Sequence, residues 1–296
     1  MKSAGPLRLG LGGLCKCSVK AISRFGEDDL LTYAAAMAYL MLFSLYPFLI
    51  FLSALLGILR IPGFFEQLIA QAQAVLPGQA MAIVEQVVGQ IREQNSVGLL
   101  LFGIIAALWS GSAAVRALMH ALNAAYHVEQ ERVSWKRYPL SIVYAILLSV
   151  AVIAALGFAL IKTQDMRWIG EQLGISDVLV MLWPWVHFPV AILLLLGVLA
   201  FVYYALPNAD EPLRLVTPGA LLAVIVWVAT SLGFSYFVSN FVLYNATYGS
   251  LGTFMALQLY LFISAAVLLL GAEMNVEIYY RLGEDDEEGA KNQEGC

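Results

Sequence analysis

Residues 248–280 read YGSLGTFMALQLYLFISAAVLLLGAEMNVEIYY, an apolar stretch that is long enough to cross a lipid bilayer. A crossing helix needs about 20 mostly apolar residues. The carboxylate of Glu273 lies inside the stretch, where a charged side chain is costly and needs a partner. Five comparable apolar stretches precede this one in the chain. The sequence therefore predicts a polytopic membrane protein.

The composition agrees with this prediction. Hydrophobic residues make up 61% of the 296 residues and charged residues 12%, whereas an average soluble domain has about 45–50% and 25%. The net charge of −5 comes from an acidic run at residues 284–288, inside an expected disordered cytoplasmic tail over residues 283–296. The expected partner is the lipid bilayer. No nucleic-acid partner is expected, and the sequence does not indicate an oligomeric state.

The predicted fold class is all-α, a polytopic membrane bundle of six transmembrane helices over residues 29–282. The spans are expected at about residues 31–58, 97–121, 139–161, 179–205, 215–241 and 251–279. In the long connection at about 64–95, apolar residues recur at helical spacing on both sides of a Pro-Gly pair. We expect an amphipathic helical hairpin on the outer side, which either packs over the span ends or lines an aqueous vestibule.

The basic residues predict the orientation. Twelve of the 16 Lys and Arg residues fall on the side that holds both termini, and four fall on the opposite side. By the positive-inside rule, both termini are expected in the cytoplasm. Residues 1–28 are then a basic, partly amphipathic arm on the cytoplasmic face.

A buried polar site is expected near the cytoplasmic ends of the second and sixth spans. Glu273 lies about six residues from the end of its span, or about 9 Å deep at a rise of 1.5 Å per residue. Arg116 lies at a similar depth in the second span. We expect a Glu273–Arg116 ion pair, with Asn123 and Asn275 as hydrogen-bonding neighbours.

One face of the sixth span extends this site. Glu277 and Arg281 follow Glu273 at intervals of four residues, and a Glu that precedes Arg by four residues is favourably oriented. Three interpretations remain open for the buried charges. They form a structural clasp between helices, they belong to a proton or ion relay or substrate path, or they reach the interface without a partner.

A helix discontinuity is predicted in the first span. Pro47 removes one helical hydrogen bond and frees the carbonyl of Phe43, and the hydroxyl of Ser44 is close enough in sequence to satisfy part of that loss. Such a discontinuity is either a packing kink or part of a binding site, as in many transporters.

The link between the fifth and sixth spans is short and polar. It runs from Asn245 through Tyr248 to Gly252, and Gly249 and Gly252 suit a tight turn, while Ser250 suits a helix N-cap. Two alternatives remain for this outer segment: a capped turn, or a re-entrant turn that serves as an outer gate.

Several separate motifs in the right order resemble the YihY/virulence factor BrkB family of bacterial inner-membrane proteins, historically mislabelled ribonuclease BN. The resemblance covers about residues 20–282, and its motifs are Ala34-Ala35-Ala36-x-Ala38-Tyr39, Leu42-Phe43-Ser44-Leu45-Tyr46-Pro47, Leu108-Trp109-Ser110, Ala121-Leu122-Asn123, Thr217-Pro218-Gly219-Ala220, Asn245-Ala246-Thr247-Tyr248-Gly249-Ser250-Leu251-Gly252 and Gly271-Ala272-Glu273-x-Asn275. It implies six membrane helices and a bacterial inner-membrane location. It implies no settled activity, although transport has been suggested for some members.

No catalytic residue, metal ligand or cofactor is expected. The three histidines and three cysteines lack the spacing of a metal site. A ribonuclease would need clustered acids with a metal, or a general acid–base pair, beside a basic groove. We therefore expect a non-enzymatic protein, with transport of an unidentified ion, lipid or small amphiphile favoured. The alternative is a non-transporting scaffold or envelope-integrity factor.

Overall fold

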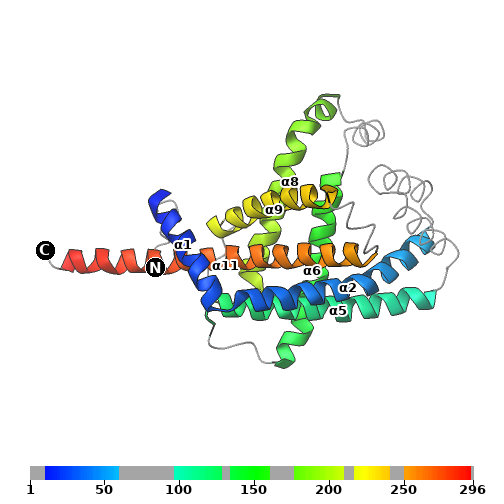
Figure 1. Ribbon diagram of the computed structural model, residues 1–296, viewed down its shortest axis with the longest axis horizontal. Helices are drawn as coiled ribbons and strands as arrows, with labels where there is room; N and C mark the ends of the chain where they lie inside the picture. The colour runs from blue at the N-terminus through cyan, green and yellow to red at the C-terminus, as the bar shows by residue number, and fades with distance from the viewer. Residues whose placement is uncertain are drawn as a thin grey trace. The chain divides into compact units, whose positions relative to one another are not determined.

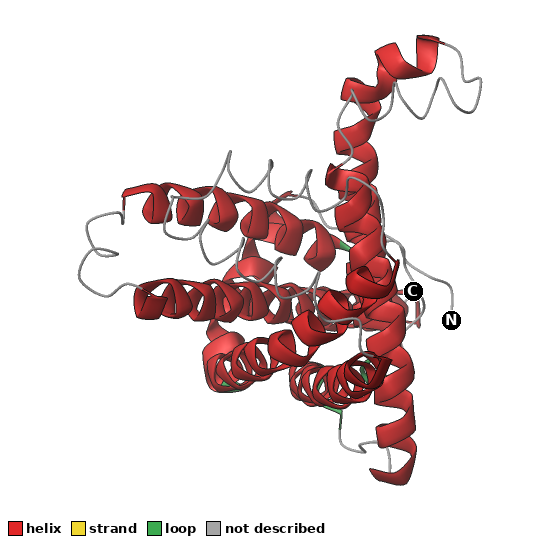
Figure 2. Ribbon diagram, turned by 90° about the vertical axis from the view of Figure 1, so that its right-hand side faces the viewer, coloured by secondary structure: helices red, strands yellow, loops and turns green. Residues whose placement is uncertain are grey.

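The computed structural model describes residues 11–59, 97–128, 134–160, 177–209, 217–240 and 250–294. Helices dominate these residues, and the described ranges contain no strand (Figures 1 and 2). The all-α prediction is therefore confirmed for the described part of the chain.

A helix occupies each predicted span. The helices after the N-terminal arm are α2 (Leu30–Leu59), α5 (Val97–Ala125), α6 (Ser134–Leu160), α8 (Asp177–Ala205), α9 (Pro218–Asn240) and α11 (Ser250–Glu294). Among the residues that the structure describes, five segments are long and apolar enough to cross a membrane: Leu30–Phe51, Leu100–Ala125, Trp185–Ala205, Pro218–Phe237 and Phe254–Arg281. The helix α6 fills the place of the third predicted span but is not among these five, so the number of crossings stays a prediction. The predicted outer hairpin at 64–95 lies outside the described residues.

The ends of the chain differ from expectation. Residues Leu11–Glu27 of the basic arm form a helix, α1, and α11 continues as a helix to Glu294. The acidic tail was expected to be disordered. Its glycines and aspartates are poor helix formers, but adding residues to an existing helix avoids the nucleation cost.

Contacts divide the chain into two compact units, residues 1–39 with 115–296 and residues 40–114. In the first unit, α11 packs against both α1 and α9, and α8 packs against both α6 and α9 (Figure 1). Large apolar side chains on these helices remain exposed, including Trp185 (80%), Tyr236 (74%) and Leu232 (69%). Such exposed apolar helix faces are expected to contact lipid.

In the second unit, α2 and α5 approach closely at Gly103. A Cβ atom at Gly103 would lie 2.8 Å from the Cα atom of Phe51, so only glycine fits there. The helix α2 continues through Pro47, and the hydroxyl of Ser44 donates to the carbonyl of Met41 at 2.8 Å. The helix is therefore continuous at Pro47, and the choice between a packing kink and part of a binding site stays a prediction.

The start of α9 positions the end of α11. Thr217 is the N-cap, because its Oγ1 accepts the N–H of Ala220 at 3.1 Å, and Pro218 opens the first turn as expected. The N–H of Gly219 donates to Oδ1 of Asn275 on α11 at 2.9 Å. Two motifs that are 50 residues or more apart in sequence thus meet at one helix crossing.

Candidate functional site

The helices α1 and α11 meet along a face that carries both apolar and charged side chains. Cys17 and Ala21 of α1 are buried against Met274 and Ile278 of α11. Ser18 adds a hydrogen bond from its hydroxyl to the Met274 sulfur at 3.7 Å. The arm is therefore part of the folded unit and covers one face of α11.

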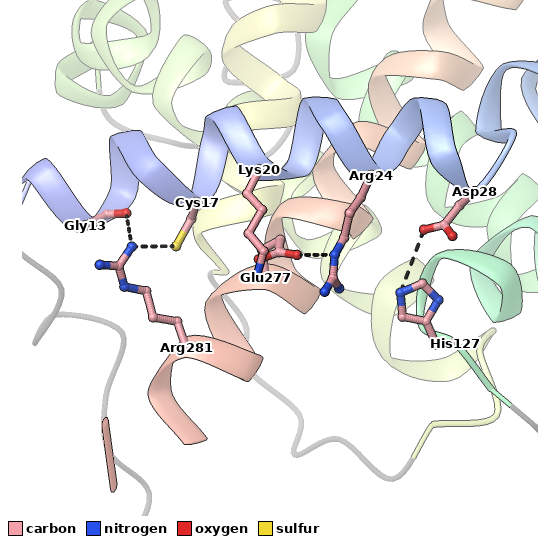
Figure 3. Close-up of polar contacts among 8 residues, drawn as sticks. All are labelled: Gly13, Cys17, Lys20, Arg24, Asp28, His127, Glu277 and Arg281. Atoms are coloured by element: carbon pink, nitrogen blue, oxygen red, sulfur yellow. Dashed lines mark hydrogen bonds and ion pairs between the residues drawn. The ribbon is translucent and has the colours of Figure 1, made fainter. Parts of the chain in front are cut away.

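Charged contacts follow the same face, one helical turn apart. Glu277 binds Lys20 and Arg24 of α1, and one turn further on Arg281 donates to the carbonyl of Gly13 at 3.4 Å and contacts the sulfur of Cys17 at 4.0 Å (Figure 3). As the α11 residue number rises, the α1 residue number falls. The two helices therefore run in opposite directions, and the α11 face that bears Glu277 and Arg281 faces α1.

Glu277 is a structural clasp. Its side chain is 2% exposed, and its carboxylate oxygens lie 3.1 Å from Lys20 Nζ and 2.7 Å from Arg24 Nε. A buried carboxylate with two cations is compensated, whereas removal of one partner from a buried pair is strongly destabilising. The sequence pointed to Arg281 as the favourable partner of Glu277, but the structure gives that role to Lys20 and Arg24.

Glu273 lies one turn earlier on α11 and has a different environment. Its side chain is completely buried, and neither carboxylate oxygen accepts a hydrogen bond from the described residues. Asp28 and His127 lie near it, since one ligand atom from each of the three residues lies within 4.8 Å of the other two. Asp28 Oδ2 is also buried without a hydrogen bond, and it lies 3.7 Å from His127 Nε2 (Figure 3).

Helix ends bring Asp28 and His127 to this place. The helix α1 stops at Glu27, and the N–H of Asp28 still bonds to the carbonyl of Arg24 at 2.8 Å. The helix α5 stops at Ala125 and closes with a Schellman pair, His127 N–H to the Ala124 carbonyl and Val128 N–H to the Asn123 carbonyl. Both side chains therefore sit just beyond a helix C-terminus.

His127 occupies a strained backbone position. Its φ is 50°, in the left-handed region where glycine is the usual residue at this point of a Schellman motif. A residue with a Cβ atom costs about 1–2 kcal/mol there. The histidine is thus held in an unfavourable conformation that directs its ring to Asp28 and to the ring of Tyr280, 6.4 Å away.

The expected Glu273–Arg116 ion pair is not the arrangement that the structure provides. Arg116 donates to the hydroxyl of Ser141 at 3.2 Å, and its guanidinium lies over the ring of Tyr138 at 4.7 Å. Both of these residues belong to α6, so Arg116 ties α5 to α6. Depth explains the difference, because Glu273 lies near His127, just beyond the C-terminus of α5, whereas Arg116 lies nine residues, or about 14 Å, before that end.

Asn123 and Asn275 are buried but cap other backbone segments. Asn123 Oδ1 accepts the N–H of Asn208 at 2.9 Å, and Asn275 accepts the N–H of Gly219. Among the predicted gate residues, Asn245, Tyr248 and Gly249 lie outside the described residues, whereas Gly252 is buried inside α11.

The sequence interpretation missed Lys20, Arg24, Asp28 and His127. A usable signal was present, since Cys17, Ala21, Arg24 and Asp28 recur at helical spacing and give α1 one face that matches α11. The proximity of Asp28, His127 and Glu273 had no such signal, because about 100 or more residues separate each from the next.

Comparisons with known proteins agree with a membrane family. The family model described as "Virulence factor BrkB" matches residues 21–295. A Bacillus subtilis (strain 168) relative named "Putative ribonuclease-like protein YfkH" is 35% identical over 269 residues, 90% of this chain and 96% of the relative. No solved structure matches the chain.

Two further relatives are named only as UPF0761 membrane proteins. The one from Alkalilimnicola ehrlichii is 30% identical over 84% of this chain, and the one from Chromohalobacter salexigens is 28% identical over 86%. The matched region spans 55% and 60% of these two relatives.

Proposed function

The chain belongs to the virulence factor BrkB family of membrane proteins, and from this premise we propose that it transports or translocates an ion, lipid or small amphiphile across a bacterial inner membrane. Both termini then lie in the cytoplasm, in agreement with the distribution of basic residues. No catalytic step is assigned to the chain.

The observation that carries the proposal is the environment of Glu273. A carboxylate that is completely buried within the apolar segment Phe254–Arg281, without a hydrogen bond from the described residues, is costly to keep. A purely structural role would be served better by a fixed cation, and Glu277 one turn away has two. The exchangeable partner of Glu273 is therefore a proton, an ion or a cationic group of a substrate.

Substitution of Glu273 distinguishes a transport role from a purely structural role as a clasp. If Glu273 were a clasp, its cation would be Arg24 of α1, whose charge acts on Glu273 and whose Nη1 is buried without a hydrogen bond, and replacement of Glu273 would destabilise the protein by about 3–5 kcal/mol. If it serves an exchangeable partner, Glu273→Gln removes an uncompensated buried charge, so the fold retains its stability while flux is lost.

The test uses purified full-length protein in proteoliposomes. Flux of monovalent and divalent ions and movement of labelled phospholipids are measured for the wild type, for Glu273→Gln and for the matched control Glu277→Gln. The proposal expects a flux in the wild type that Glu273→Gln abolishes at unchanged melting temperature. Glu277→Gln is expected to lower flux only in proportion to its loss of folded protein.

Two outcomes contradict the proposal. Wild-type vesicles that move no ion and no lipid would favour the scaffold or envelope-integrity alternative. A Glu273→Gln variant that melts well below the wild type and regains flux when it is refolded at low temperature would assign Glu273 to the structure alone.

A further inference from the structure

The side chains of Asp28, His127 and Glu273 form a cluster that the transport proposal does not fully use. They come from the turn after α1, the end of α5 and the interior of α11, and their ligand atoms lie within 4.8 Å of one another. We propose that this cluster is a binding site for a divalent transition-metal ion, of the range from Mn²⁺ to Zn²⁺.

The donor set fits this class of ion. One imidazole nitrogen and two carboxylate oxygens suit borderline metals that accept mixed nitrogen and oxygen ligands, whereas Mg²⁺ and Ca²⁺ prefer oxygen alone. Two carboxylates and a neutral imidazole carry a charge of −2, which a divalent cation balances. Three protein ligands also leave coordination positions open, as in metal sites that exchange water or a substrate group.

The three ligand atoms would have to move only slightly closer together to bind one ion. Ligand atoms around a tetrahedral ion with bonds of about 2.0–2.1 Å are separated by about 3.3–3.4 Å. Asp28 Oδ2 and His127 Nε2 are 3.7 Å apart, and the widest separation in the cluster is below 4.8 Å. Rotation of the carboxyl groups about their broad terminal torsions would have to shorten the widest separation by at most about 1.4 Å.

A second observation points to a ligand independently of the grouping. Glu273 is completely buried and directs a carboxylate without a hydrogen bond toward the other two residues, and Asp28 Oδ2 is likewise buried without one. Buried acceptors normally have partners.

The strained backbone at His127 is consistent with a ligand role. A non-glycine residue at φ 50° persists where the surrounding structure holds it in place, and strain of this kind is concentrated at functional sites. This backbone position also allows a test variant that should fold, because the glycine in His127→Gly fits the left-handed conformation while the imidazole is removed.

The inference shares Glu273 with the proposed transport function, but binding is measured in detergent, where no flux exists. Full-length protein with Cys15 and Cys296 replaced by serine, and with the buried Cys17 retained, is stripped with a chelator and dialysed against Mn²⁺, Co²⁺ or Zn²⁺, and the bound metal is counted by mass spectrometry. The variants are Asp28→Asn, His127→Gly and Glu273→Gln. The matched controls are Glu27→Gln, an exposed carboxylate next to Asp28 in sequence that accepts a hydrogen bond from Ser23, and His120→Gln, a histidine that contacts Arg137.

The expected result is one ion per wild-type chain and a loss of affinity of about 100-fold or more in each ligand variant, since even outer-shell changes cost 10–100-fold. The controls are expected to bind as the wild type does. A wild type that binds no ion would overturn the inference and leave a proton or Arg24 as the counter-charge. So would ligand variants that bind normally, or controls that lose as much affinity as the ligand variants. Metal binding without flux in vesicles would uphold the metal site and refute transport.

Discussion

The crossing of α9 and α11 at Gly219 and Gly271 gives the sharpest prediction about stability. A Cβ atom at Gly271 would lie 2.7 Å from the carbonyl oxygen of Gly219 and 2.8 Å from the Cβ atom of Ala223. Ordinary contacts begin at 3.4 Å, so the two helices would have to separate by about 0.7 Å to admit Gly271→Ala. The Tyr203 hydroxyl would also have to move, because it lies against the same point.

The separation would also break the hydrogen bond that joins the first turn of α9 to Asn275 of α11. The Gly219 N–H lies 2.9 Å from Asn275 Oδ1, so a retreat of about 0.7 Å extends it to about 3.6 Å, which is beyond a hydrogen bond. Overpacking costs about 1–3 kcal/mol and loss of the hydrogen bond about 1 kcal/mol. The expected total is about 2–4 kcal/mol, or a fall in melting temperature of about 5–10 °C.

The assay is thermal unfolding of the purified protein in detergent, with Gly233→Ala on α9 as the matched control. A Cβ atom at Gly233 meets nothing within 4 Å, so the same substitution is expected to be neutral or slightly stabilising there. Equal melting temperatures for Gly271→Ala and Gly233→Ala would refute the close backbone approach.

Three further predictions concern the same end of the molecule. Glu277→Gln should release α1 from α11 and lower the free energy of unfolding by about 1–3 kcal/mol. The ion pair with Lys20 contributes little, because Lys20 is 55% exposed, and the pair with Arg24 contributes more, because Arg24 is 28% exposed. In a background with Cys15 and Cys296 replaced, the buried thiol of Cys17 should then react faster with a maleimide, and an unchanged rate would show that the clasp does not hold the arm. Asn275→Ala should cost about 1–2 kcal/mol in thermal unfolding through the lost cap on Gly219, and a melting temperature equal to the wild type would contradict that role. Tyr203→Phe should cost about 1 kcal/mol, because the hydroxyl donates to the Leu268 carbonyl at 2.8 Å, and a more stable variant would exclude that bond as a net contributor.

Much of the fold is a local property and could be predicted. The length and apolarity of a segment decide whether it can cross a membrane. Each of the six predicted spans coincides with a helix, and most helix ends lie within a few residues of the prediction. The exceptions are the start of α6, which comes five residues early, and the C-terminus of α11, which extends further. The role of Pro218 in the first turn of α9 followed from its fixed φ and missing N–H. The motif around Glu273 also identified the family that the comparisons show.

An all-α membrane protein of the BrkB family, with a costly buried carboxylate at Glu273, thus follows from residue order alone. Which charges meet depends on how the helices pack. Glu277 is compensated by Lys20 and Arg24, Arg116 contacts α6, and Glu273 faces Asp28 and His127. The physical reason is that partners across helices depend on the rotation and packing of each helix, which no local spacing encodes.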